Sequence, residues 1–153
     1  MSSQQSALLF QVDTPGVSRR GLRTFLKRLE QEVGQGRGFC CLIASDAELQ
    51  RLNREFRKRD YATDVLSFPQ ANVGQTLSSA NSGEIAISYE AAQRQSAEYG
   101  HSVQQEVKIL MLHGLLHLLG MDHETDHGRM LTAERKWRIH LGLPAGLIER
   151  VSA

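Results

Sequence analysis

Three histidines lie within residues 113–123, which read H-G-L-L-H-L-L-G-M-D-H. If this segment begins as a helix, His113 and His117 lie one turn apart on the same face, where both imidazoles can reach one ion. Gly120 favours a helix end with left-handed backbone, after which the chain can turn back and bring His123 to the same ion. Three protein ligands with an open fourth position are typical of catalytic zinc, whereas structural sites usually have four. We therefore predict one zinc ion per chain, bound by His113, His117 and His123.

The residue that follows the first histidine bears on the type of chemistry. Metzincin proteases have the same histidine spacing, as H-E-x-x-H-x-x-G-x-x-H, and their glutamate is the general base. This chain has Gly114 at that position. We therefore favour a metal-dependent hydrolase other than a peptidase, and keep the peptidase or amidohydrolase as an alternative. Asp122 and Glu124 are candidates for a proton acceptor or for a partner of a ligand imidazole.

The other histidines and a run of arginines are the remaining candidates for functional residues. His101, His127 and His140 lack metal-ligand spacing, so we expect structural roles for them, with His127 the nearest in sequence to the site. A basic run follows residue 50, in which arginines recur at three-residue steps and would share one side of a helix. Such a side could contact phosphate oxygens, or it could simply be a solvated face. These arginines are Arg51, Arg54 and Arg57.

Composition limits the class of protein. The chain has 153 residues, of which 41% are hydrophobic, and we expect one domain spanning residues 1–153. A formal net charge of +1 gives no overall attraction to polyanions, so contact with nucleic acid would need a local patch. No apolar segment has the length of a membrane span and the N-terminus is polar, so we expect a cytoplasmic protein without a membrane partner. Cys40 and Cys41 are adjacent in an apolar run, and we expect buried, reduced thiols.

Hydrophobic periodicity predicts strands interleaved with helices, which indicates an α+β fold with a small mixed sheet covered by helices. The helix that carries His113 and His117 is apolar nearly all round, so we expect it to be central. Ser102 and Gln105 form a capping box at its start. We predict strands at residues 7–12, 39–43, 65–68 and 84–89, and helices at residues 17–33, 46–56, 89–99, 102–119 and 126–141.

With these residues in view, the chain resembles the YbeY family of bacterial endoribonucleases over most of its length. The family signature H-G-x-L-H-L-x-G-x-D-H is met at every fixed position of residues 113–123. Two further segments resemble the family, F-R-K-R-D-Y-A-T-D-V-L-S-F-P at residues 56–69 and S-G-E-I-A-I-S-Y-E-A-A-Q-R-Q-S-A-E-Y-G-H at residues 82–101. The chain departs from the family at Glu84, where aspartate is usual, and at Lys58, where glycine is common.

The resemblance implies a zincin-like fold whose central helix binds one zinc ion through the three histidines. It also implies a functional role for Arg57, and cleavage of single-stranded RNA in maturation of the 3′ end of 16S ribosomal RNA and in ribosome quality control. The implied partners are the 16S precursor, proteins of the small ribosomal subunit and a ribosome-assembly GTPase. The residues leave the general base open, and either water or the RNA 2′-hydroxyl could be the nucleophile. A non-catalytic RNA-binding or ribosome-binding module, with Asp122 or Glu124 closing a structural zinc site, is the remaining alternative.

Overall fold

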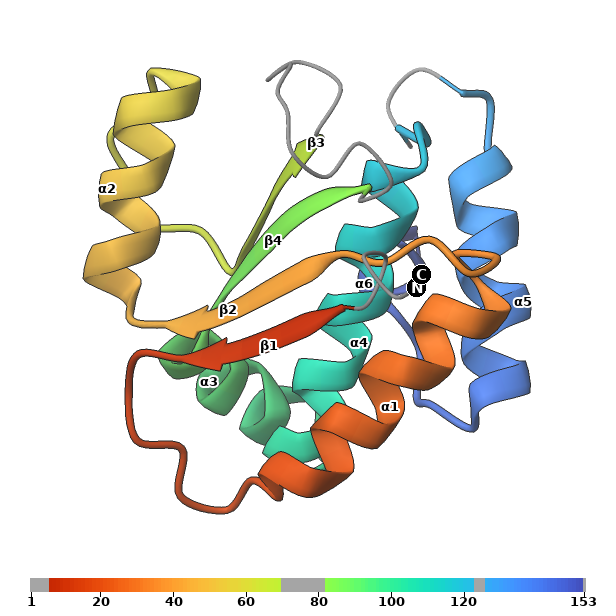
Figure 1. The fold of residues 1–153 in the computed structure, drawn as a ribbon, viewed down its shortest axis with the longest axis horizontal. Coiled ribbons are helices and arrows are strands. Elements are labelled where there is room, and N and C mark those ends of the chain that lie inside the picture. The colour runs from red at the N-terminus through yellow and green to blue at the C-terminus, as the bar shows by residue number, and fades with distance from the viewer. Residues whose placement is uncertain (1–5, 70–81, 123–125, 153) are drawn as a thin grey trace.

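The computed structural model describes residues 6–69, 82–122 and 126–152, and in these ranges four strands form one sheet that six helices cover (Figure 1). The strands are β1 (Ala7–Phe10), β2 (Cys40–Ala44), β3 (Val65–Pro69) and β4 (Gly83–Ser88). The helices are α1 (Arg19–Glu32), α2 (Asp46–Arg57), α3 (Tyr89–Tyr99), α4 (Val103–Leu118), α5 (Arg129–Leu141) and α6 (Leu147–Ser152). The predicted α+β class is confirmed.

The sheet is mixed, as predicted, with the strand order β1-β2-β4-β3. Strands β1, β2 and β4 run parallel, and β3 pairs antiparallel with β4 at one edge. In this register Cys41 lies beside Ile85, and Leu66 lies opposite Ala86. Strand β4 is therefore central, so residues on both of its faces are covered by helices.

Successive side chains of β4 divide between the two faces of the sheet, because the side-chain period of a strand is two. Ile85 and Ile87 belong to the larger core, to which α1, α4 and α5 also contribute. Ala86 belongs to a smaller core on the other face, with Leu49 of α2 and Leu66 of β3. Helix α2 therefore covers one face, while α1, α3 and α4 lie on the other, as Figure 1 shows.

Helix α4 is buried over most of its circumference, as its apolar sequence predicts. Its buried side chains are those of Glu106, Val107, Ile109, Leu110, Met111, Leu112, His113, Leu115, Leu116 and Leu118. The predicted capping box is present, since the Ser102 side chain accepts from the backbone of Gln105 and the Gln105 side chain accepts from that of Ser102. The helix that carries the two histidines is thus central and has a defined start.

The helix predicted at residues 46–56 agrees with α2, whereas the prediction for the last part of the chain is partly wrong. Ser45 is the N-cap of α2, because its hydroxyl accepts from the backbone N–H of Glu48, and the Asp46 carboxylate binds Ser88 and Arg94. The helix predicted at residues 126–141 starts at Arg129 and is followed by α6, which the sequence analysis did not predict. Helix α6 is too short to show helical periodicity, which explains the omission.

The two cysteines differ in burial: Cys41 is buried, as expected, whereas Cys40 is half-buried. Burial raises the pKa of the Cys41 thiol far above its ordinary value. Cys41 is therefore an unreactive core residue at neutral pH. In the part of the chain that the structure describes, none of the helices has the length and apolar character needed to cross a bilayer.

Candidate functional site

His113 and His117 lie side by side near the C-terminal end of α4. Their ring centroids are 4.8 Å apart and their planes meet at 75°. His113 is buried and His117 is half-buried. Two neutral imidazoles on successive turns are a donor set that zinc favours, so these residues fit the predicted metal.

The chain turns directly after the second histidine, as Gly120 predicts. Gly120 has φ of +95°, a left-handed conformation that glycine adopts without strain. The N–H of Gly120 donates to the carbonyl of His117, and the N–H of Met121 donates to that of Leu116, so the turn closes the helix end. The third predicted ligand, His123, lies outside the described residues, as does Glu124. Within the described ranges no three His, Cys, Asp or Glu side chains are grouped to hold a metal ion.

Gly114 lies where α4 packs closely against the sheet. A Cβ atom at this position would be 2.8 Å from Cγ2 of Ile85 on β4, which is closer than packed carbon atoms approach. The Ser67 hydroxyl of β3 also donates to the Gly114 carbonyl at 3.0 Å. Packing therefore explains the glycine at this position. Without a side chain, α4 can approach β3 and β4 closely, and this contact fixes the side of α4 that carries the histidines relative to the sheet.

This packing gives a testable prediction for Gly114→Ala. Overpacking a core costs about 1 to 3 kcal/mol, and the higher helix propensity of alanine offsets roughly 1 kcal/mol of it. We expect a net loss of up to about 2 kcal/mol in the free energy of unfolding, measured by urea denaturation. In an Ile85→Ala background, which removes the close atoms, the same substitution should cost nothing. Equal losses in both backgrounds would contradict the packing explanation.

A buried carboxylate on α5 contacts His113. Oε2 of Glu134 lies 2.9 Å from Nδ1 of His113, and the Glu134 side chain is 1% exposed. Glu134 was not among the residues predicted from the sequence, where Asp122 and Glu124 were the candidates for such a role. The sequence did contain an indication of this role. Glu134 lies on the same side of α5 as Met130 and Leu141, and a charged side chain on a buried side of a helix requires a partner.

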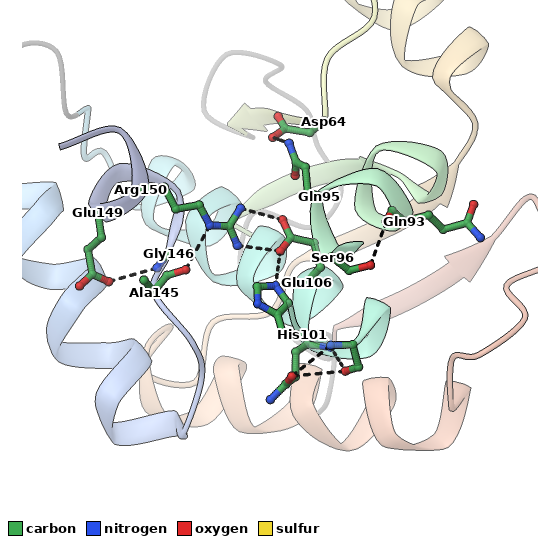
Figure 2. Close-up of polar contacts among 12 residues, drawn as sticks. Asp64, Gln93, Gln95, Ser96, His101, Glu106, Ala145, Gly146, Glu149 and Arg150 are labelled. Carbon is green, nitrogen blue, oxygen red and sulfur yellow. Dashed lines mark hydrogen bonds and ion pairs between the residues drawn. The ribbon is translucent and has the colours of Figure 1, made fainter. Parts of the chain in front are cut away.

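Helix α6 is joined to the rest of the fold by a second buried carboxylate, that of Glu106 on α4 (Figure 2). Arg150 of α6 binds it with both terminal nitrogens, at 3.0 and 2.6 Å, and its guanidinium also lies 4.2 Å from the centre of the Tyr99 ring. Nε2 of His101 lies 2.6 Å from the same carboxylate. His101 therefore has the structural position that was expected of it, as does His140, whose Nε2 is 2.7 Å from Glu32.

A cavity of about 290 Å³ lies beside His113, with walls from α3, α6 and Asp64. The Gln95 amide donates to the Asp64 carboxylate at 3.0 Å on one side of it, and Arg150 contributes to the other side (Figure 2). His113 therefore borders a cavity with mixed walls, in which Asp64, Gln95, Glu98 and Arg150 supply polar groups and Leu147 and Ile148 supply apolar side chains.

The arginines of α2 do not form the uniform basic face that their spacing suggested. Arg51 is paired with Glu48 at 2.7 Å and with Glu55 at 2.9 Å, and Arg54 with Asp60 at 3.4 Å. These carboxylates offset much of the positive charge that would attract phosphate.

Arg57 is exposed and is the last residue of α2. Arg57 lies on α2, which covers the opposite face of the sheet from α4, the helix that carries His113 and His117. Figure 1 nevertheless shows the C-terminal ends of α2 and α4 on the same upper side of the molecule.

The two departures from the family pattern have simple structural settings. Lys58 is the C-cap of α2 with φ of +59°, so the turn typical of glycine is kept although the residue is lysine. Glu84 is exposed near the start of β4, opposite Phe68, where the longer side chain has room.

Comparisons with known proteins agree with the resemblance of the three segments. The model of the family described as Endoribonuclease YbeY matches residues 14–142. A curated relative named Endoribonuclease YbeY from Solibacter usitatus is 51% identical over 152 residues, which cover 99% of each chain. One of the same name from Koribacter versatilis is 45% identical and covers 90% of this chain and 86% of the relative.

A solved structure supports the fold independently. The solution structure of a Thermotoga maritima protein has a TM-score of 0.59 with this chain at 24% identity, covering 87% of this chain and 86% of that one. At this identity the likeness concerns the fold. The sequence matches go further and cover the candidate histidine segment, and they show that the chain belongs to the YbeY family of endoribonucleases.

Proposed function

We propose that this protein is a zinc-dependent endoribonuclease that cleaves single-stranded RNA, with one zinc ion held by His113, His117 and His123 in a zincin-like site on α4. The observation that carries the proposal is the pair of imidazoles 4.8 Å apart on successive turns of α4, within the segment that matches the family signature. A zinc ion bound there would supply Lewis-acid chemistry for phosphodiester hydrolysis.

The residues of the chain have separate tasks in this proposal. The histidines bind the ion, and the fixed packing of α4 at Gly114 holds two of them at a constant position relative to the sheet. Arg57 binds phosphoryl oxygens and stabilises the negative charge that develops on them, since a guanidinium fits two oxygens at once. A strand of RNA that crosses the upper side of the molecule would pass both the end of α2 and the end of α4 (Figure 1).

The peptidase alternative is disfavoured by the surroundings of Gly114. A glutamate there would have its Cβ against Ile85, so it could not take the place of the protease base without a shift of α4 or β4. By resemblance to the family, the proposed substrate is the 16S ribosomal RNA precursor. The proposed partners are small-subunit ribosomal proteins and a ribosome-assembly GTPase, and the proposed compartment is the cytoplasm.

Product analysis on a defined single-stranded RNA tests the proposed function. We expect cleavage by the purified protein, loss of cleavage after zinc chelation and recovery when zinc is returned. The RNA ends identify the nucleophile, because attack by the 2′-hydroxyl leaves a cyclic phosphate and attack by water does not. Zinc-dependent cleavage of casein by a preparation inert toward RNA would instead support the peptidase.

Arg57→Ala should lower single-turnover cleavage at saturating RNA by about two to three orders of magnitude, by analogy with loss of one preorganised donor. Zinc content and melting temperature should be unchanged, because the side chain is exposed. Arg57→Lys should recover only part of the rate, since lysine keeps the charge and loses the forked geometry. Arg51→Ala is the matched comparison, and its carboxylate partners lead us to expect a near-normal rate. Equal, modest losses in both variants would remove Arg57 from the catalytic assignment.

A further inference from the structure

Glu134 is one of the least exposed charged side chains among the described residues, and both of its oxygens have partners. Oε2 lies 2.9 Å from Nδ1 of His113, and Oε1 accepts from the backbone N–H of Ile148 at 2.9 Å. The Glu134 side chain is 1% exposed, and that of His113 is 7% exposed. A buried carboxylate is stable only when its oxygens accept hydrogen bonds, so these two contacts define where the group can lie.

The backbone before α6 closes around the same carboxylate. A Cβ atom on Gly146 would lie 2.6 Å from both Cδ and Oε1 of Glu134, so at this position only glycine fits without a shift. The Gly146 N–H donates to Glu149, which also binds Arg138, and this anchors the turn that carries Ile148. Glu134 is thus held from one side by a fixed loop and presented to His113 on the other.

The hydrogen-bonding chemistry of the pair determines which nitrogen of His113 carries the proton. A carboxylate accepts and does not donate, so the proton of a neutral His113 lies on Nδ1, and Nε2 is the nitrogen with a lone pair for a metal. The same contact fixes the rotation of the ring, because Nδ1 must point toward α5.

From this geometry we propose that Glu134, held by the Gly146–Ile148 turn, is a positioning residue that selects the Nδ1–H tautomer of His113 and orients its Nε2 toward the zinc ion. The inference deepens the proposed function and rests on it for the identity of the ion.

Glu134→Gln is the informative substitution because it keeps the volume and changes the hydrogen bonding. The two donors meet different oxygens of Glu134, and glutamine has an oxygen in only one of these two places, so it can accept there from Nδ1–H of His113 or from the N–H of Ile148 while its NH₂ group faces the other. The matched control is Glu149→Gln. Glu149 holds the same turn through Gly146 and Arg138, whereas the carboxylate that contacts His113 is that of Glu134.

The first measurement is zinc affinity by competition with a chromogenic chelator. We expect Glu134→Gln to weaken zinc binding by roughly 10- to 100-fold, the range found when partners of metal-bound histidines are lost. Glu149→Gln should bind zinc nearly as the unmodified protein does. Equal weakening in both variants would assign the effect to packing between α5 and α6 and would overturn the proposal, as would unchanged affinity in Glu134→Gln.

The second measurement needs no metal. Long-range proton–nitrogen NMR spectra of the metal-free protein report the tautomer of His113, and we expect the Nδ1–H form in the unmodified protein and in Glu149→Gln. Glu134→Gln should show a mixture of tautomers. If the unmodified protein bound no zinc, the proposed function would fail while these spectra still tested the action of Glu134 on His113. An unchanged tautomer in Glu134→Gln would overturn that action.

Discussion

His117→Ala is expected to leave the protein folded with far less than one zinc ion per chain, and to lower RNA cleavage to the level of chelator-treated protein. Removal of one of three histidines leaves too few ligands for a stable catalytic zinc site. Because His117 is half-buried at the end of α4, its loss should alter the core little. Elemental analysis of the purified variant and cleavage of a single-stranded RNA are the two measurements.

His140→Ala is the control for this substitution. His140 is 54% exposed and pairs with Glu32 on α1, away from the candidate ligands. It should retain full zinc and full activity. A His117→Ala protein that kept one zinc ion per chain would exclude His117 as a ligand, and with it the proposed set of three histidines.

Arg150→Ala is expected to lower the free energy of unfolding by about 3 to 5 kcal/mol, because it leaves a buried carboxylate without its cation. Glu106 is fully buried, and the Arg150 side chain is 7% exposed. An effect of this size is a large part of the total stability of a domain, about 5 to 15 kcal/mol. Urea denaturation at neutral pH measures it.

The comparison for Arg150 is Arg135, which pairs with Glu149 at 3.3 Å and is 54% exposed. An exposed ion pair contributes at most about 1 kcal/mol, so Arg135→Ala should change stability little. Addition of Glu106→Gln to Arg150→Ala should recover part of the loss, because it removes the unpaired charge. If Arg150→Ala cost no more than Arg135→Ala, the contact would not stabilise the fold as proposed.

Local sequence patterns were sufficient for much of the fold. The start of α4 follows from Ser102 and Gln105, and its central position follows from its apolar residues. The position of His113 beside His117 follows from a spacing of four residues, and the turn after them follows from Gly120. Each of these features depends on neighbours within a few residues, where helix geometry allows few alternatives.

Features that depend on distant residues were missed. Glu134 is 21 residues after His113, and the Ile148 N–H that holds it is 14 residues further on. Periodicity describes which side of a helix is buried, and it does not identify the group on another element that meets that side. The sequence left the role of the arginine run open for a similar reason, since the carboxylates that pair with Arg51 and Arg54 could not be placed without side-chain positions.

The close approach of α4 to Ile85 at Gly114 limits how this histidine site could be converted to a metzincin protease site by evolution or by design. One codon change would write the metzincin motif into the chain, but the new side chain would emerge against Ile85 rather than into open space. The Gly114→Glu substitution would therefore lower the stability of the fold before any peptidase activity could arise. An engineer would have to enlarge the space at β4 first and introduce the glutamate second, and a natural lineage would face the same order of steps.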